Sequence, residues 1–384
     1  MTPAARIAAA IPLLDQILAG APAEKVLTGW GRANRFAGSG DRAALRDLVY
    51  LSLRRRRSLA ALGGADTGRG LMLGALREAG EDPAVMFTGQ GHAPPPLGPA
   101  DTGRAPNAAE ALDLPDWLIP AFRQSLGDEA EAVARSLRDR APVFLRVNLL
   151  KATPESAIAA LARDGITASP HPLAATALEV GQGARKIQQS AAYLDGLVEL
   201  QDAASQAVVQ ALPLQPGMSV LDYCAGGGGK TLALAARLRG PVSAHDANPG
   251  RMRDLPERAG RAGARVRLVE KPARHAPFDL VLADAPCSGS GSWRRDPQGK
   301  WLLTPARLAE TLAVQAAILT EIAPLVVPGG YLAYATCSLL QAENDDQIQG
   351  FLARSSDFSL TGQHHFTPLS GGDGFYLAVL RRAG

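Results

Sequence analysis

The second half of the chain alternates short apolar runs with stretches of helical periodicity. Apolar runs typical of strands lie at 218–222, 242–246, 266–269, 278–284, 330–336 and 374–380. Helical patterns at 230–239, 250–262, 305–323 and 342–353 fall between most of these runs. Repeated strand–helix alternation is typical of a mostly parallel sheet covered by helices on both faces. The pattern therefore predicts a Rossmann-like α/β domain over residues 206–384.

The first half of the chain divides into three parts by pattern and composition. Apolar residues recur at helical spacing through residues 1–88, which predicts a helical domain, and Ser39 and Asp41 are candidate caps of one of its helices. Residues 89–112 are rich in Pro and Gly and lack periodicity, so we expect a linker or extended connector. Helical and strand patterns are mixed over residues 113–205, which predicts a small α+β subdomain.

Composition narrows the class of protein. Hydrophobic residues make up 46% and charged residues 20% of the 384 positions, which is ordinary for a globular protein. No long uncharged apolar run predicts a membrane span, and the first residues resemble the start of a helix rather than a secretory leader. Three cysteines without a CxxC pair argue against a disulfide framework and against a metal site. We therefore expect a cytoplasmic protein without bound metal or membrane, and a monomer.

The net charge of +3 is small, but the basic residues are clustered. Clusters of this kind suit phosphate backbones, although a solvated helix face explains any single run equally well. The clusters are Arg32, Arg35, Arg42 and Arg46, the run Arg54-Arg55-Arg56-Arg57, and Arg294-Arg295 with Lys300.

A glycine-rich turn joins the first predicted strand of the α/β domain to its helix, in VLDYCAGGGGKTLALAARL. Glycines permit a sharp turn and close approach of a ligand, and the helix that begins near Lys230 presents free N–H groups. Asp246 follows at the end of the next strand, where an acid can hold ribose hydroxyls. A P-loop would need glycine at Cys224, and a dinucleotide loop would need glycine at Thr231. The pattern favours a nucleoside cofactor without phosphates, such as S-adenosylmethionine.

Two cysteines follow predicted strand ends in Gly/Ser-rich turns. Asp284 ends one strand and precedes Cys287 by three residues, and Cys337 directly follows another strand. Strand ends meet at one edge of a parallel sheet, so these groups are expected near the glycine turn, in a setting that favours reactive thiols. A thiolate that adds to cytosine C6 makes C5 nucleophilic, an acid offsets the charge on the ring, and a second group removes the C5 proton. Two thiols and one acid can supply this set.

Three segments together, LDYCAGGGGKT, DAPCSGSGSWRRDPQGKW and YATCSLLQAEND, resemble the RsmB/Sun family of RNA 5-methylcytosine methyltransferases. The resemblance continues in LRVN, LVELQDAASQ and GGDGFYLAVLRR and covers roughly residues 113–384. It implies an S-adenosylmethionine-dependent methyltransferase domain over 206–384. The N-terminal block FAGSGDRAALRDLVYLSLRRRRS is similar to the NusB-like RNA-binding domain of bacterial small-subunit ribosomal RNA members, so RNA binding is implied for residues 1–88 and 113–205.

The resemblance also implies roles for particular residues. Cys337 would be the nucleophile, Cys287 would assist release of the methylated RNA, and Asp284 would contact the cytosine near the cofactor. Arg251 is a further candidate on the cofactor side, and Asp246 would hold the ribose. The cofactor would be wrapped by Cys224, Ala225, Gly226, Gly227, Gly228, Gly229 and Lys230.

Two departures from the family pattern concern the cofactor. The family loop reads Ala-Pro-Gly-Gly-Lys, whereas glycine fills all four positions before Lys230 here, which adds ordering entropy on binding. The acid expected near adenine is absent, and Glu270 is the nearest carboxylate in sequence. Small-subunit ribosomal RNA is the leading substrate, with Trp293 and Trp301 as candidate base-stacking residues. Transfer RNA, or a non-catalytic RNA-binding assembly factor, remains the alternative.

Overall fold

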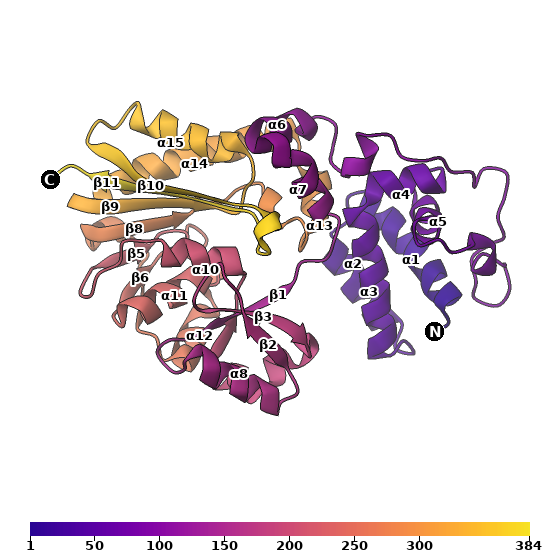
Figure 1. The fold of residues 1–384 in the computed structure, drawn as a ribbon, viewed down its shortest axis with the longest axis horizontal. Helices are drawn as coiled ribbons and strands as arrows, with labels where there is room; N and C mark the ends of the chain where they lie inside the picture. Colours follow the sequence, from indigo (N-terminus) through magenta and orange to yellow (C-terminus); the bar gives the residue numbers. More distant parts are fainter. The chain divides into compact units, whose positions relative to one another are not determined.

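The computed structural model describes residues 1–384 and divides into two compact units (Figure 1). One unit, the helical unit, comprises residues 1–140 and 293–304. The other, the sheet unit, comprises residues 141–292 and 305–384. The predicted boundaries at 88/89 and 112/113 differ from this division, which falls instead at Arg140/Ala141.

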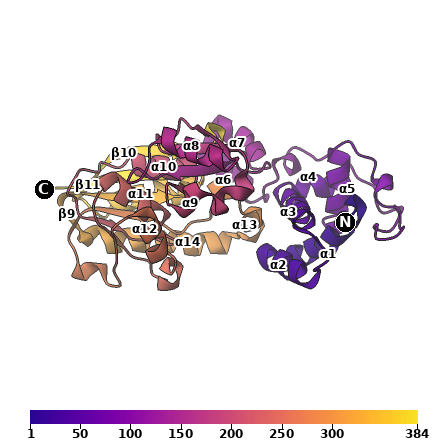
Figure 2. The ribbon, with the colours of Figure 1, turned by 90° about the horizontal axis from the view of Figure 1, so that it is seen from below.

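The helical unit is built from apolar helices packed around one core, as Figure 2 shows for its first five helices. Leu14, Leu53 and Leu71 are among its fully buried side chains. Gly38, rather than Ser39, caps the third helix, and Asp41 accepts from the Gly38 N–H. The helices are α1 (Pro3–Leu18), α2 (Ala23–Ala33), α3 (Ser39–Arg54), α4 (Arg56–Gly63), α5 (Gly68–Glu78), α6 (Leu118–Leu126), α7 (Ala130–Ser136) and α13 (Pro297–Leu302), with 3-10 turns η1 (Pro83–Val85), η2 (Glu110–Leu112) and η3 (Gly127–Glu129).

The Pro/Gly-rich segment 89–112 is an extended connector that is fastened to the helices. Arg69 donates to both carboxylate oxygens of Asp101, at 2.9 and 2.7 Å. Arg77 donates to the Asp101 carbonyl, and the Arg104 N–H donates to the Ala61 carbonyl at 2.9 Å. These bonds explain why the segment belongs to the helical unit instead of separating two domains.

Residues 293–304 belong to the helical unit although the sequence places them inside the α/β domain. Trp293 is 1% exposed and stacks on Phe122, with ring centroids 6.0 Å apart. The Lys300 Nζ donates to the Arg54 carbonyl at 3.0 Å, and the Trp301 Nε1 donates to a neighbouring carbonyl in α3. The segment directly after the Cys287 turn therefore packs within the helical unit.

The sheet unit begins with a four-stranded antiparallel sheet of order β2-β3-β1-β4. Its core contains Leu145, Leu161 and Ile166, and the helix α8 begins at a Thr153 cap that accepts from the Ser156 N–H. This is the predicted α+β element. Its parts are β1 (Val143–Val147), α8 (Pro154–Arg163), β2 (Thr167–Pro170), β3 (Ala177–Gln182), η4 (Ala184–Gln189), α9 (Ala191–Leu194) and β4 (Val198–Leu200).

The larger sheet of this unit has seven strands in the order β10-β11-β9-β8-β5-β6-β7. The five strands from β9 to β7 are parallel and the last two, β11 and β10, are antiparallel, which confirms the predicted Rossmann-like fold. The strands are β5 (Val220–Asp222), β6 (Val242–Ala244), β7 (Val266–Leu268), β8 (Phe278–Asp284), β9 (Val326–Thr336), β10 (Phe358–Phe366) and β11 (Phe375–Arg382). Sequence analysis missed β10 because this edge strand is mostly polar and exposed.

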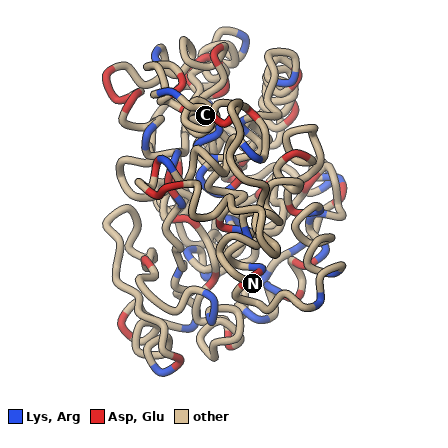
Figure 3. Tube along the Cα trace, turned by 90° about the vertical axis from the view of Figure 1, so that its right-hand side faces the viewer, with Lys and Arg blue, Asp and Glu red and all other residues tan.

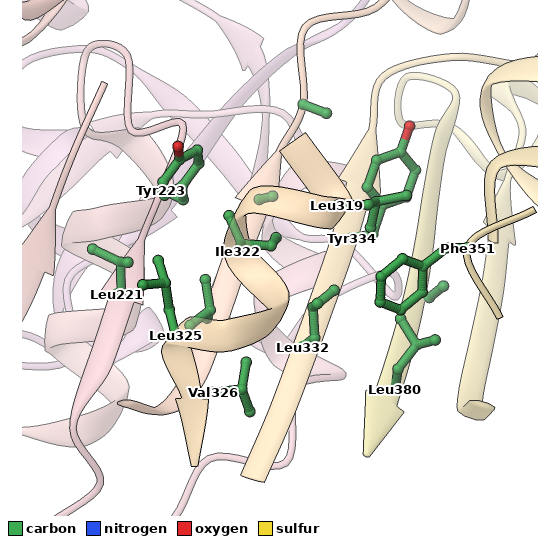
Figure 4. Packing of buried hydrophobic residues seen from close by; sticks show 14 of the residues in the cluster. Leu221, Tyr223, Leu319, Ile322, Leu325, Val326, Leu332, Tyr334, Phe351 and Leu380 are labelled. Atoms are coloured by element: carbon green, nitrogen blue, oxygen red, sulfur yellow. The ribbon is translucent and has the colours of Figure 1, made fainter. Parts of the chain in front are cut away.

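Helices cover both faces of this sheet (Figure 1). Leu319, Ile322 and Phe351 pack on one face, as Figure 4 shows, whereas Val208 and Leu234 pack on the other. The helices are α10 (Ala203–Gln210), α11 (Gly229–Leu238), α12 (Leu255–Ala262), α14 (Pro305–Ile322) and α15 (Asp345–Leu352), with 3-10 turns η5 (Pro249–Met252), η6 (Pro272–Arg274), η7 (Ser290–Ser292), η8 (Ala323–Leu325), η9 (Gln341–Glu343) and η10 (Pro368–Ser370).

The stretch Pro305–Leu325 is long and apolar enough to cross a membrane by length and composition alone. Leu319 and Ile322 of this stretch are fully buried in the sheet unit's core. A core helix of a folded domain passes the same test of composition, so the stretch is weak evidence for a membrane span.

Candidate functional site

The two cysteines that follow strand ends lie side by side. The Cys287 Sγ and Cys337 Sγ are 3.3 Å apart, and both residues are only partly buried. The hydrogen bond from Cys287 lowers the pKa of the Cys337 thiol below its usual value. The same hydrogen bond, together with burial, raises the pKa of Cys287 well above its usual value. Of the two thiols, Cys337 is therefore the one that loses its proton more readily, as a nucleophile requires.

Backbone contacts hold these two turns together. The Gly291 N–H donates to the Cys337 carbonyl at 2.9 Å, and the Gly374 N–H donates to the Gly291 carbonyl at 2.9 Å. A Cβ at Gly291 would lie 2.1 Å from the Gly374 carbonyl oxygen, so only glycine fits there. The Leu339 N–H also donates to the Ser290 Oγ at 2.8 Å. Ser290 and Gly291 of the Cys287 turn thus let the two turns approach closely enough for the thiols to meet.

Asp284, at the end of β8, forms an ion pair with Lys230 of α11. The Lys230 Nζ lies 2.7 Å from the Asp284 Oδ2 and 4.7 Å from the centroid of the Phe375 ring. Lys230 is 6% exposed, so it is a buried residue of the site rather than a surface charge on the helix. The carboxyl group of Asp284 is more accessible, with 32% of its side chain exposed. The pair places an accessible carboxylate and a fixed positive charge at one sheet edge.

Asp222, at the end of β5, is a third acidic residue at this edge. It is fully buried and accepts from the Thr231 Oγ1 at 2.6 Å. Burial raises the pKa of Asp222 to about 7, and its Oδ1 is buried without a hydrogen-bond partner. A buried unpartnered carboxylate oxygen is costly, and native proteins tend to retain one only for a reason such as function.

The glycine turn is shaped by close packing and by Asp246. Gly226 and Gly228 have φ values of 51° and 83°, which favour glycine, and a Cβ at Gly228 would lie 2.2 Å from the Leu255 Cδ1. The Gly226 N–H donates to the Asp246 Oδ2 at 2.9 Å, and the half-exposed Arg251 pairs with the same oxygen at 3.1 Å. Asp246 therefore supports the turn and lies directly beside it.

The other residues of the predicted cofactor loop are also held by the protein. The Ala225 N–H donates to the His245 carbonyl at 2.8 Å, and the Gly227 carbonyl accepts from Arg258. Burial raises the pKa of the partly buried Cys224 thiol, so this cysteine stays protonated and is no rival nucleophile. Glu270 is exposed.

Sequence analysis missed Arg146, which belongs to the small sheet and supports the start of α11. Its guanidinium donates to the Gly229 carbonyl at 2.6 Å and to the side chain of Gln201. Arg146 is 3% exposed, and burial lowers its pKa to about 10. Both residues lie in the segments LRVN and LVELQDAASQ that carry the family resemblance, and this was the signal available in the sequence.

The structure corrects the expected role of two basic clusters. Arg54, Arg294 and Lys300 are at most 8% exposed, and burial lowers the pKa of Lys300 to about 7. The rest of the first run forms ion pairs within the helical unit, Arg55–Glu78, Arg56–Asp66 and Arg57–Asp116, each 2.7 Å long. Trp293 is buried as well and cannot stack on a base. Arg54, Arg294, Lys300 and Trp293 are therefore inaccessible to a phosphate backbone, whereas Arg55, Arg56 and Arg57 are engaged in ion pairs within the helical unit.

The other arginines of the first 50 residues that formed the predicted cluster are exposed. Arg32, Arg35 and Arg42 make no ion pair, and Phe36, next to Arg35 in the chain, is 74% exposed. Arg46 instead pairs with Glu24. Figure 3 shows Lys and Arg positions mixed with Asp and Glu positions over much of the chain. We call Arg32, Arg35, Phe36 and Arg42 the α2–α3 basic surface.

Comparison with known proteins agrees with this geometry. The family model described as 16S rRNA methyltransferase RsmB/F matches residues 209–381, and a ferredoxin-like domain of RsmF/B-like methyltransferases matches residues 114–187. Ribosomal RNA small subunit methyltransferase B of Serratia proteamaculans is 33% identical over 298 residues, which are 72% of this chain and 68% of that protein.

Two solved structures extend the likeness to the fold. The crystal structure of PH0851 has a TM-score of 0.78 and 26% identity, and the match covers 100% of this chain and 99% of that one. A methyltransferase homologue from Pyrococcus horikoshii has a TM-score of 0.63 and 26% identity, with 71% of this chain and 96% of that one covered.

Proposed function

Because the chain belongs to the RsmB/F family of 16S ribosomal RNA methyltransferases, we propose that it transfers a methyl group from S-adenosylmethionine to C5 of a cytosine in small-subunit ribosomal RNA. The proposed reaction proceeds through a covalent adduct between Cys337 and C6 of the base. The observation that carries this proposal is the 3.3 Å approach of the Cys287 and Cys337 thiols, beside the Lys230–Asp284 pair.

The residues around the glycine turn fit S-adenosylmethionine. The turn of residues 226–229 leaves no Cβ in the way of a ligand, and the first N–H groups of α11 suit the cofactor's carboxylate. We expect Asp246, which accepts from the Gly226 N–H, to accept also from the ribose hydroxyls. Asp222 and Asp284 add acidic groups that favour a positively charged sulfonium, and the buried Asp222 Oδ1 lacks a partner within the protein. When bound there, S-adenosylmethionine supplies the methyl group.

Cys337 is the proposed nucleophile because the hydrogen bond from Cys287 stabilises its thiolate. The Cys337 sulfur forms a bond to C6, and the C5–C6 double-bond electrons become available for methylation at C5. The negative charge that then develops toward N3 is offset, in this proposal, by a proton that the Asp284 carboxyl group presents to N3, with the Lys230 ammonium behind it as the source of that proton.

Cys287 is the proposed proton acceptor for release. After methylation, the C5 proton must leave with its bonding electrons returned to the ring, and the sulfur–C6 bond of Cys337 then breaks. Once Cys337 has bonded to the base, Cys287 loses its own proton to water. Its thiolate, a strong base because the pKa is raised, then accepts the C5 proton beside the sulfur that departs. The steps restore both thiols to their starting protonation.

We assign RNA binding by the helical unit to the α2–α3 basic surface. Arginines pair with phosphates, and an exposed aromatic ring stacks on an unpaired base. Arg32 and Arg42 line a hollow of about 340 Å³ together with Trp30, which is wide enough to admit part of a nucleotide. The likeness of this unit to NusB stays a prediction.

The test uses purified protein, labelled S-adenosylmethionine and unmodified small-subunit ribosomal RNA, with transfer RNA as the competing substrate. We expect label in 5-methylcytosine of the ribosomal RNA after nucleoside analysis, and none with Cys337→Ala. Asp346→Asn, an exposed acid of α15 that has no part in the proposed reaction, is the control and should retain transfer. Label in transfer RNA alone would replace the proposed substrate, and full activity of Cys337→Ala would refute the proposed nucleophile.

A further inference from the structure

Glu343 lies six residues after Cys337 in the segment YATCSLLQAEND and has no role in the scheme above. It is fully buried and contacts both cysteine turns. We propose that Glu343 is a positioning residue that holds the Cys287 turn in place for the release step. This inference rests on the proposed function, because it explains how hydrogen bonds to Glu343 keep Cys287 in the position that the proposed release step requires.

The Glu343 carboxylate accepts hydrogen bonds from three other residues of the sheet unit. The Ser288 N–H donates to its Oε1 at 2.7 Å, and the Ser288 hydroxyl donates to its Oε2. The Gln315 Nε2 donates to Oε1 at 3.1 Å, and the Ser338 hydroxyl donates to Oε2. One carboxylate thus bridges the residue after Cys287, the residue after Cys337 and the helix α14.

The Cys287 turn depends on this network more than the Cys337 turn does. Ser288 makes both a backbone and a side-chain bond to Glu343, and the Pro286 carbonyl accepts from the Gln315 Nε2 at 3.0 Å. Gln315 is itself bonded to Glu343, so both residues that flank Cys287 are fixed through the same carboxylate.

The Cys337 turn has further supports that do not involve Glu343. Cys337 directly follows β9, and its carbonyl accepts from the Gly291 N–H at 2.9 Å. Asn344 donates to the Ser338 carbonyl at 3.0 Å and accepts from the Thr336 hydroxyl at 2.6 Å. Loss of the Glu343 carboxylate should therefore displace Cys287 while Cys337 keeps its position.

The chemistry of the network requires a carboxylate. The donors from Ser288, Ser338 and Gln315 converge on Glu343, and a carboxylate is an acceptor-only group that can receive them all. A glutamine has the same size but presents an NH₂ group, which would face a donor. Glu343→Gln therefore breaks part of the network without leaving a cavity.

The experiment compares formation and release of the covalent protein–RNA adduct in the full chain. At a pH above the ordinary pKa of a thiol, where the Cys337 thiolate forms without the hydrogen bond from Cys287, we expect Glu343→Gln to form the adduct near the parent rate. Release of methylated RNA should be at least about tenfold slower, so that a denaturing gel shows accumulated adduct, as for Cys287→Ala. Ser288→Ala should give the same signature more weakly. Asp346→Asn, an exposed acid on the following helix, is the control and should match the parent protein.

A purely structural role predicts a different result. The amounts of covalent adduct and of methylated RNA would then both decrease in proportion to the folded fraction of the protein. In that case no adduct would accumulate, and the inference would be overturned. Accumulation in Cys287→Ala but not in Glu343→Gln or Ser288→Ala also overturns it, while leaving the proposed function intact. Absence of adduct in Cys287→Ala points instead to failure of the proposed function itself.

Discussion

The thiol cluster of the sheet unit (Cys287, Cys337 and Asp284) and the arginine run of the helical unit (residues 54–57) both concentrate reactive or charged side chains. The side chains of the cluster converge on one accessible site, whereas those of the run are buried or paired separately. In the cluster, Cys287, Cys337 and Asp284 converge at one sheet edge and stay partly accessible. In the run, Arg54 is buried and Arg55 is paired with Glu78. The strand ends fix where residues of the cluster point, whereas a helix can turn successive arginines in every direction. A motif placed at strand ends therefore carries more functional information than a run of like charges.

The largest effect on the rate of methyl transfer should come from substitution of Asp284, the acid of the thiol cluster. Asp284→Asn keeps the size of the side chain but removes the carboxyl group that takes a proton from Lys230 and presents it to the ring. We expect the single-turnover rate of methyl transfer to fall by about 10²–10³-fold, the range seen when one preorganised electrostatic partner is lost. Asp279→Asn, near the other end of β8, is the control. A fall of less than threefold for Asp284→Asn would remove Asp284 from the reaction.

The next largest effect is expected on the affinity for S-adenosylmethionine when the glycine turn is altered. Gly228→Ala adds a Cβ 2.2 Å from the Leu255 side chain at a φ of 83°. A left-handed conformation costs an alanine roughly 1–2 kcal/mol, and the turn must shift further to relieve the clash. We expect the Kd of S-adenosylmethionine, measured by calorimetry, to rise at least about tenfold. Gly227→Ala, where φ is not positive and the nearest atom is an arginine tip at 3.2 Å, should change it less; equal effects would contradict this account of the turn.

Substitution of the buried Arg54 should lower the free energy of unfolding, whereas substitution of an exposed arginine such as Arg35 should not. Arg54→Met removes a hydrogen bond from the Arg54 Nε to the Arg294 carbonyl, 2.8 Å long, and leaves a buried acceptor without its partner. We expect a loss of about 1–3 kcal/mol in the free energy of unfolding, measured with urea. Arg35→Met, on the exposed α2–α3 basic surface, should leave stability unchanged. Similar losses for both would show that the two arginine groups do not differ in role.

For RNA affinity we expect the opposite: substitutions of the exposed arginines should weaken binding more than substitution of the buried Arg54. Arg32→Gln, Arg35→Gln and Arg42→Gln each remove an exposed charge that makes no ion pair within the protein. Each substitution should weaken RNA binding a few-fold and reduce the slope of log affinity against log salt by about 0.7, as for one phosphate contact to a single strand. Glu24→Gln is a useful control, because it frees Arg46 and should not weaken binding. An unchanged salt slope would exclude this surface from RNA binding.

A smaller effect is expected in the pH dependence of adduct formation. The thiolate of Cys337 is the reactive form, and the hydrogen bond from Cys287 holds its pKa below the usual value. Adduct formation in the parent protein should therefore rise with pH and level off below the ordinary pKa of a thiol. In Cys287→Ala the donor is lost, so the midpoint should move to higher pH. A midpoint that stays in place would show that Cys287 does not support the thiolate.

The sequence predicted the parallel core of the sheet, the glycine turn and the thiol pair because strand periodicity and turn composition are local signals. The strand β8 was predicted with the bounds that the structure has, 278–284. The position of residues 293–304 within the helical unit was not predictable, because Trp293 and Lys300 are buried by residues far away in sequence. Glu343 was missed for the same reason, since its role depends on donors from Ser288 and Gln315.

The central claim is that Cys337 bonds to the base and that Cys287 is needed for release. The most direct measurement is mass spectrometry of Cys287→Ala after incubation with S-adenosylmethionine and small-subunit ribosomal RNA, followed by nuclease and protease digestion. The account predicts a peptide that carries a methylated cytidine on Cys337, absent when Cys337 is also replaced by alanine. A nucleotide bound to another residue, or no covalent product while methyl transfer continues, would contradict it.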